Sequence, residues 1–199
     1  MAEPRTRVSW EDAVQSAARR IRRDGIARLD LDNVRDDLGA APGAVRYWVS
    51  DETDLLVSIM GVRQRWFLDQ ADTRLAAVKS HSEKMSALLE LCVADHDMTY
   101  WIELWKLARR DERARRSRQE LTSRYRELFA RVIRAGQRAG EFGAVPADRA
   151  ALVLVGLVVG LSVDATVGGD ERADAMGDAL VGACECLLEA DLRGAGRAS

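Results

Sequence analysis

The stretch from Leu31 to Leu56 constrains the fold of this chain more than any other. Asp30 precedes it and can accept a hydrogen bond from the first turn of a helix, and Gly39 lies where helices commonly end. Between them, three apolar residues recur at helical spacing: Leu31, Val34 and Leu38. The pattern predicts a helix of about two turns that a glycine turn terminates.

A second short helix is expected directly after that turn. Pro42 suits its first turn, because the missing N–H would have no partner there, and the helix continues from Gly43 to about Val49. A helix, a glycine turn and a second helix form the helix-turn-helix pattern, whose second helix can enter the major groove of DNA. Four residues are therefore expected to approach DNA: Pro42, Gly43, Arg46 and Tyr47.

The side chains in this second helix have different expected roles. Arg46 can donate two hydrogen bonds to a guanine edge or can meet a phosphate. For Tyr47 we favour DNA contact, and for Trp48 we favour packing against neighbouring helices. Pro42 and Gly43 let the backbone approach DNA closely.

From Ala13 to Leu56 the chain resembles the N-terminal domain of TetR-family transcriptional repressors. The resemblance is carried by an ordered set: Gly25 at the end of the first helix, Asp30 as a cap, Gly39 in the turn, Gly43 and Ala44 in the second helix, Tyr47 and Trp48, then Glu52, Asp54, Leu55 and Leu56. It implies a DNA-binding domain over residues 1–50 and a ligand-sensing, dimerising domain over residues 51–199.

The charge of this region departs from the family pattern. Family members usually have an aromatic residue in place of Arg46 and lysines in place of Pro42 and Glu52. Residues 31–56 hold two arginines against six acidic residues, whereas DNA binding draws on phosphate neutralisation by lysine and arginine. The alternative is therefore a TetR-like protein with weak or lost DNA binding that acts through a protein partner.

The remaining chain is predicted to be all-α. Strand-like alternation is nearly absent from its 199 residues, of which three are proline. The expected helices cover residues 9–24, 51–78, 85–92, 98–107, 112–139, 146–167 and 171–192. The N-terminus lacks an apolar signal segment, and the three cysteines are poorly spaced for disulfides or zinc, as expected for buried or half-buried thiols in the cytoplasm.

The helix expected over residues 146–167 is apolar on every side, so we expect it to be buried all round. It is too short for a membrane span and is flanked by charges. Gly156 and Gly160 are four residues apart and permit close helix packing. Together with the last helix it is expected to form a four-helix bundle across a two-fold axis, with interface residues on both helices: Gly156, Gly160, Leu180 and Leu187.

Aromatic residues on inward stripes of three expected helices suggest a ligand pocket: Trp66, Trp101, Trp105, Tyr125 and Phe129. The alternative is that they are ordinary core residues. Aromatic faces suit an apolar or cationic compound, with Glu103 or Asp164 supplying a balancing charge. Arginines dominate residues 106–140, where they either form a solvated helix face or a nucleic-acid patch; the resemblance places this segment away from DNA.

No catalytic set stands out, and no cofactor or metal is expected. His81 and His96 lie in polar breaks, where we expect them to be solvated. The WIELW segment and GQRAGEF loosely resemble the choline-responsive branch of the TetR family. Altogether the resemblance implies a homodimeric one-component regulator, a repressor, that binds a palindromic DNA operator and is released by a small-molecule effector.

Overall fold

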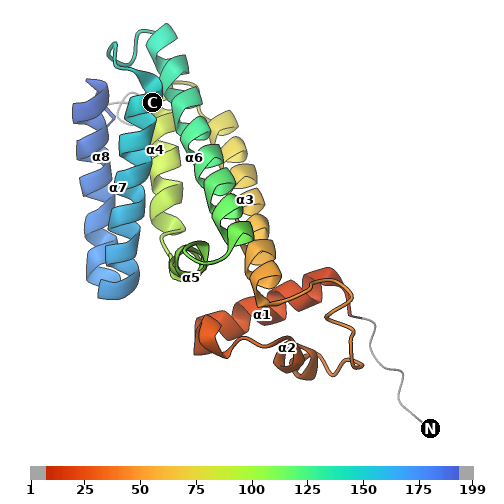
Figure 1. Ribbon diagram of the computed structural model, residues 1–199. Helices are drawn as coiled ribbons and strands as arrows, with labels where there is room; N and C mark the ends of the chain where they lie inside the picture. The colour runs from red at the N-terminus through yellow and green to blue at the C-terminus, as the bar shows by residue number, and fades with distance from the viewer. Residues whose placement is uncertain (1–7, 193–199) are drawn as a thin grey trace. The chain divides into compact units, whose positions relative to one another are not determined.

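The computed structural model describes residues 8–192, apart from the side chains of residues 170, 171, 173 and 174. Over this range the chain is entirely helical, without a strand, which confirms the predicted all-α class (Figure 1). Eight α-helices and one short 3-10 helix follow in order: α1 Trp10–Asp24, η1 Ile26–Arg28, α2 Leu31–Asp37, α3 Glu52–Ala77, α4 His81–Ala94, α5 Thr99–Ala108, α6 Glu112–Arg138, α7 Ala147–Gly168 and α8 Asp170–Leu188.

Side-chain capping explains where α1, α2 and α4 begin. Ser9 caps α1, since its hydroxyl accepts from the Asp12 N–H at 3.1 Å while the Asp12 carboxylate accepts from the Ser9 N–H at 3.0 Å. Ser80 and Glu83 repeat this capping box at the start of α4. Asp30 caps α2, as predicted, by accepting from the Asp32 N–H at 2.8 Å.

The helices form two compact units, each assembled from two segments of the chain. The first unit comprises Met1–Gln64 and Thr99–Gln119, and the second comprises Arg65–Met98 and Glu120–Ser199. The N-terminal half of α3 and the first two turns of α6 therefore belong to the first unit, and the remainder of each helix belongs to the second. These units are defined by contacts within the structure. The division into a DNA-binding domain over residues 1–50 and a ligand-sensing domain over residues 51–199 stays a prediction.

In the first unit, α1 and α2 bury one apolar face each. Burying such a face supplies stability of about 25 cal/mol for each Å² of apolar surface. The side chains on these faces are at most 4% exposed: Ala13, Val14, Ala17, Ile21, Leu31 and Val34. α5 belongs to the same unit, where the Tyr100 hydroxyl donates to the Ala18 carbonyl at 3.1 Å. α1 is thereby held on one side by α2 and on another by α5.

The second unit is organised around a continuous apolar cluster. The C-terminal half of α3 and of α6 contribute to it together with α4, α7 and α8, which lie along one another in Figure 1. Phe129 is 1% exposed and Leu180 is fully buried. At the end of α6, the Gln137 amide donates to the Gly143 and Val145 carbonyls at 2.9 and 2.6 Å, which orders the loop before α7.

The expectation that the apolar helix α7 is buried all round is wrong. One face packs on the core, but Leu152, Val153 and Val167 are 47%, 44% and 79% exposed. A Cβ added at Gly156 or Gly160 would meet no atom within 4 Å, so these glycines do not serve close packing within the described chain. By length and composition α7 could span a membrane, which is weak evidence because core helices of soluble proteins pass the same test.

Candidate functional site

The segment from Pro42 to Trp48 is a succession of turns, not the continuous α-helix that we predicted. Its hydrogen bonds mix two spacings: Ala44 and Trp48 donate three residues back, whereas Tyr47 and Val49 donate four back. Gly43 has φ +81°, a left-handed conformation that interrupts a right-handed helix. The positive φ of Gly43 explains why the second helix of the helix-turn-helix pattern is irregular.

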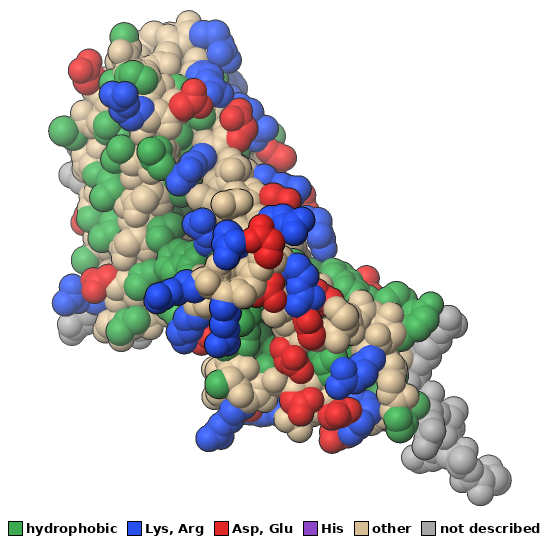
Figure 2. Space-filling model, viewed as in Figure 1, with side chains coloured by type: hydrophobic (Ala, Val, Ile, Leu, Met, Phe, Trp, Pro, Cys, Tyr) green, Lys and Arg blue, Asp and Glu red, His purple; other side chains and the backbone are tan. Residues whose placement is uncertain are grey.

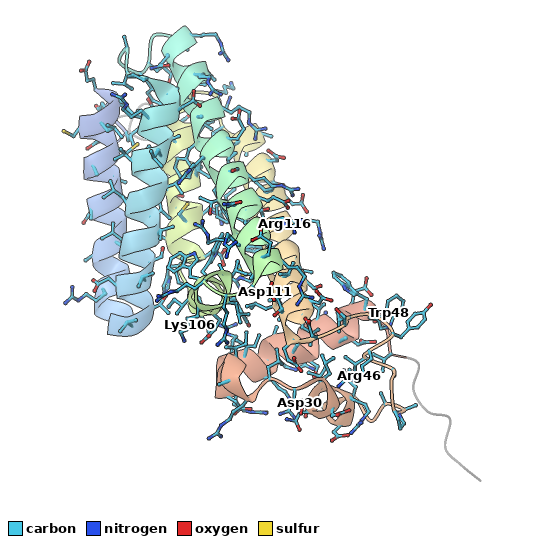
Figure 3. The ribbon with its side chains drawn as sticks, in the orientation of Figure 1. Asp30, Arg46, Trp48, Lys106, Asp111 and Arg116 are labelled. Carbon is cyan, nitrogen blue, oxygen red and sulfur yellow. The ribbon has the colours of Figure 1, made fainter. Side chains whose placement is uncertain are left out.

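This segment, residues 42–48, nevertheless presents the expected side chains. Val45 and Val49 are 2% and 5% exposed and fasten the segment to the first unit, while Tyr47 is 79% exposed. Pro42, Gly43 and Arg46 are also exposed, and Figure 3 shows Arg46 and Trp48 at this end of the unit. We call residues 42–48 the reading segment.

Trp48 is anchored by one hydrogen bond but remains 43% exposed. Its indole N–H donates to the Val8 carbonyl at 3.0 Å, and its ring meets Tyr47 edge-on with 4.8 Å between centroids. Trp48 thus orients Tyr47, whose ring points outward beside it. Trp48 was predicted to pack against neighbouring helices, and it does so only in part, since nearly half of its surface is exposed to solvent.

Two arginines of α1 and α2, Arg20 and Arg35, form ion pairs with carboxylates within the unit. Arg35 binds Asp32 at 2.6 Å and Asp36 at 2.7 Å, and Arg20 on α1 makes a two-pronged contact with Asp37 on α2 at 2.6 and 2.7 Å. The hydrogen bond from Arg20 holds the pKa of Asp37 below its ordinary value. The Arg20–Asp37 pair joins α1 to α2, and the Arg35 pairs leave less positive charge for a phosphate.

Arg113 ties the start of α6 to the start of α3. Its guanidinium binds Asp51 at 2.7 Å, Asp54 at 2.9 Å and Asp111 at 3.1 Å. Burial works to raise the pKa of Asp51, but the Arg113 hydrogen bond and the Asp54 N–H outweigh it, so that pKa is lowered. The sequence analysis treated Arg113 as one of many arginines on a helix face. Two of its partners, Asp51 and Asp54, lie about sixty residues away along the chain, so no local signal indicated them.

The five aromatic residues predicted for a ligand pocket are distributed over both units. In the first unit, Trp101 and Trp105 are half-buried, with 6.3 Å between ring centroids. In the second, Phe129 is a core residue and Tyr125 meets Phe67 at 4.9 Å. Trp66, expected on an inward stripe, is instead 49% exposed, because the α3 face that carries it is not covered within its unit.

A cavity of about 690 Å³ lies in the first unit between the α1–α2 connection and the end of α5. Ile26, Leu29 and Leu107 supply apolar walls, and Glu103 and Lys106 supply charge. Glu103 binds Lys106 at 2.9 Å through one carboxylate oxygen, whereas the other oxygen is buried with no partner among the described residues. Asp164, the other acid expected to balance a cation, instead pairs with Arg172 at 2.9 Å.

The four residues predicted for the dimer interface separate into two groups. Gly156 and Gly160 face open space on α7, and Leu187 on α8 is half-buried. Leu180 is fully buried in the core of its own protomer. Its prediction as an interface residue is therefore wrong, because it packs on the inner side of α8 and not on the outer face. The same outer face of α8 holds Cys186, which is exposed.

Two expectations about titratable groups need correction. All three cysteines were expected to be buried or half-buried. Cys92 and Cys184 are buried, and burial raises the pKa of each thiol to about 12, but Cys186 is exposed. His81 is not merely solvated, since its Nδ1 lies 2.9 Å from the Glu141 carboxylate, and the Ser82 N–H donates to that group at 2.8 Å. Burial works to raise the pKa of Glu141, but these hydrogen bonds lower it to about 2.

Comparison with known proteins gives a finding on the C-terminal part of the chain. The sequence profile of the BetI-type transcriptional repressor C-terminal domain matches residues 81–188, more than half of the chain. No curated protein sequence matches the chain significantly.

Solved structures share the whole fold. A TetR transcription regulator from Haloarcula marismortui aligns with a TM-score of 0.81 at 20% identity, covering 89% of this chain and 97% of its own. A protein from Saccharomonospora viridis in complex with choline aligns at 0.77 and 22% identity, covering 85% and 92%. The fatty acid degradation regulator FadR from Bacillus halodurans aligns at 0.74 and 16% identity, covering 93% and 95%. With the profile match and the helix-turn-helix unit, these findings show that the chain belongs to the TetR family of transcriptional regulators.

Proposed function

We propose that this chain is a homodimeric repressor that binds a palindromic operator and leaves it when a small effector binds. One observation carries the DNA-reading part: Arg46 and Tyr47 are exposed on a segment that Val45 and Val49 fasten to the unit. Residues 1–50 would read DNA, and residues 51–199 would sense the effector and dimerise, in the cytoplasm.

The reading segment can contact DNA in two ways. The Arg46 guanidinium forms no ion pair within the described chain, so its donors are available to a guanine edge or a phosphate. Pro42 and Gly43 have small or absent side chains, so the backbone approaches the groove. Tyr47 adds a hydroxyl and a ring that its edge contact with Trp48 holds outward.

The charge around the reading segment supports a second candidate, a TetR-like regulator that acts through a protein partner. The carboxylates of Asp32 and Asp36 are 55% and 63% exposed, and they share Arg35 between them. Exposed carboxylates near the groove repel phosphates and lower non-specific affinity for DNA. A specific operator contact through Arg46 must therefore outweigh this repulsion.

Selection of bound duplexes from a random DNA library separates the two candidates. The repressor enriches a palindrome whose half-sites lie about one helical turn apart, because a two-fold dimer presents two reading segments. Arg46→Ala in the same selection removes the enrichment at the contacted base. A wild-type selection without an enriched sequence rules out the repressor and favours the protein partner.

Dimerisation is proposed through the outer faces of α7 and α8. The outer face of α7 carries large apolar side chains that no part of the described chain covers, among them Leu152, Val153 and Leu157. Gly156 and Gly160 let a second helix approach along this face. Apolar surface of this kind is commonly buried in oligomers, and Figure 2 shows hydrophobic side chains over α7 and α8.

The proposed effector is an apolar or cationic compound. Support comes from the BetI-type profile match and from the choline bound to the Saccharomonospora viridis protein. The predicted aromatic set is divided between the two units, and its two half-buried tryptophans in the first unit, Trp101 and Trp105, are the candidate binding residues. An effector that favours the non-binding state lowers operator affinity by the ratio of its affinities for the two states.

Choline titration followed by thermal unfolding tests the effector class. Wild type should be stabilised in a dose-dependent way, and Trp101→Ala should lose most of that stabilisation if the aromatic set forms the site. Equal stabilisation of both proteins places the site elsewhere.

A further inference from the structure

The cavity of about 690 Å³ in the first unit is formed by three parts of the chain. They are η1 with its neighbouring residues, Glu52 and Thr53 at the start of α3, and the end of α5 with the turn that follows it. Figure 3 shows Lys106 on α5 and Asp111 in that turn. All lining residues belong to the first unit, and the volume is within the range of small-ligand sites.

Glu103 supplies a polar group to this cavity that lacks a full set of partners. One carboxylate oxygen accepts from the Lys106 ammonium at 2.9 Å, whereas the other is buried without a hydrogen-bond partner among the described residues. A buried acceptor left unpaired is costly, and more so when it carries charge. The last torsion of a glutamate side chain is broad, so the carboxylate can turn this oxygen towards a donor in the cavity. The missing component is therefore a hydrogen-bond donor.

The charge of the lining favours a cation as that donor. The lining holds three carboxylates and two cationic groups: Glu52, Glu103, Asp111, Lys106 and Arg110. Both cations are exposed, and 63% of the Lys106 side chain is open to solvent against 13% of Glu103. Solvent screens exposed charges more than buried ones, so the negative charge dominates inside. Within residues 8–192 as described, no group of three or more metal-binding side chains comes together, which favours an organic ammonium ion over a metal.

This cavity is separate from the tryptophan pair proposed for the effector. Neither Trp101 nor Trp105 lines it. Glu103 is two positions from each of them, which is about 200° around an α-helix, so it lies on the opposite side of α5. The apolar part of the cavity lies on the side of Glu103, because Leu107 is four positions away from it. The apolar walls suit a short hydrocarbon chain: Ile26, Leu29 and Leu107.

We propose that this cavity binds a small primary ammonium ion, whose N–H groups donate to Glu103 and whose hydrocarbon chain lies against Ile26 and Leu107. A primary ammonium has three N–H donors, so it satisfies the unpaired oxygen of Glu103, whereas a quaternary ammonium offers no N–H. The Glu52 carboxylate in the same lining adds electrostatic attraction. Binding links α5 to the connection between α1 and α2, within the unit that carries the reading segment. The inference does not depend on the proposed repressor function.

Methyl NMR on protein labelled at the isoleucine δ1 carbons tests the cavity, with butylammonium as the probe. The chain has five isoleucines, and Ile26→Val identifies the resonance of Ile26. Butylammonium should shift that resonance saturably and leave the resonance of Ile133, which is fully buried in the second unit, unchanged. n-Butanol lacks the charge and tetramethylammonium lacks the N–H groups, so each should bind at least about tenfold more weakly.

Two glutamate variants provide the matched comparison. Glu103→Gln keeps the shape of the side chain but removes its charge, and it should weaken butylammonium binding about tenfold. Glu120→Gln removes an exposed carboxylate on α6 outside the cavity and should leave the affinity unchanged. Equal affinities of the two variants, an unmoved Ile26 resonance, or equal binding of butylammonium and n-butanol would each overturn the proposal. Equal binding of tetramethylammonium would also overturn it, because the site would then recognise charge without a hydrogen bond. If Glu103→Gln does not fold, the comparison of the three probes on wild type decides.

Discussion

Both units bury apolar side chains, but in the first unit arginine–aspartate pairs also join the helices close to the reading segment, whereas the second unit is organised around one continuous apolar cluster. Around α1, α2 and the start of α3, arginine–aspartate pairs join separate segments, as in Arg20–Asp37 and Arg113–Asp51. The second unit instead buries a continuous set of leucine, valine, alanine and aromatic side chains. From this difference we expect substitutions that remove a charge in the first unit to alter DNA binding. Substitutions that enlarge a side chain on the outer faces of α7 and α8 should instead alter dimerisation.

The largest effect is expected from Gly156→Leu, which tests the apolar side of this contrast. A Cβ added at Gly156 meets no atom within 4 Å in the protomer, and leucine favours a helix interior over glycine, so thermal stability of the protomer should not fall. In the dimer it would overpack two symmetry-related positions, at roughly 1–3 kcal/mol each. Sedimentation should show dissociation at concentrations where wild type is dimeric.

Gly182→Leu is the companion variant, since a Cβ at Gly182 on α8 also meets nothing in the protomer. It should weaken the dimer as well if both helices form the interface. Wild-type sedimentation as a monomer at micromolar concentration, or unaltered association of Gly156→Leu, would contradict the proposed bundle.

Arg46→Ala tests the polar contacts of the first unit and has the second-largest expected effect. Loss of a base-reading arginine should cost roughly 1–3 kcal/mol in operator binding, measured by fluorescence anisotropy on the selected duplex. Arg126→Ala is the control, because it removes an exposed arginine from the second unit. If both variants bind the operator as wild type does, Arg46 is not part of the reading segment's contact.

Glu141→Gln probes a polar contact in the second unit, whose core is apolar. Because the folded-state pKa of Glu141 is about 2, below its ordinary 4.5, its contribution to stability is present above about pH 4.5. It is lost as pH falls toward 2. The difference in unfolding free energy between wild type and variant, on the order of 1 kcal/mol at a partly exposed site, should therefore shrink with acidification.

Urea unfolding between pH 2.5 and 6 measures that difference. Glu120→Gln, an exposed change on α6, serves as the control. A difference that stays constant over this range would mean that the ion pair with His81 does not stabilise the loop after α6.

Asp36→Asn is expected to give the smallest effect. It removes one exposed carboxylate and frees part of Arg35, so affinity for random duplex DNA at low salt should rise about two- to threefold. Asp69→Asn makes the same charge change on an exposed α3 position of the second unit and should have less effect. A smaller rise for Asp36→Asn than for Asp69→Asn would place α2 away from the DNA.

Most helices could be predicted because their limits depend on neighbouring residues. Asp30 caps α2 and Gly25 ends α1 as the local sequence indicates. The reading segment was mispredicted as a continuous helix because a proline suited to a helix start does not reveal the positive φ of the following Gly43. The exposed face of α7 was mispredicted because composition shows that a helix is apolar but not whether its own chain suffices to cover it.

The candidate sites were less predictable than the fold, since they depend on contacts between distant residues. Arg113 meets Asp51 across 62 positions, and His81 meets Glu141 across 60. Neither pair has a periodic or motif signal. The exposure of Arg46 and Tyr47 was predictable because the helix-turn-helix pattern that places them is a short-range signal in the sequence.

Salt dependence of binding to the selected operator is the measurement that tests the central claim most directly. Anisotropy titrations from about 50 to 200 mM salt should give a line of negative slope on logarithmic axes, since cationic side chains displace counterions from phosphates. The selected operator should remain bound at least a thousandfold more tightly than a scrambled duplex. Equal affinity for both duplexes, or no measurable binding at the lowest salt concentration, would contradict a DNA-reading repressor.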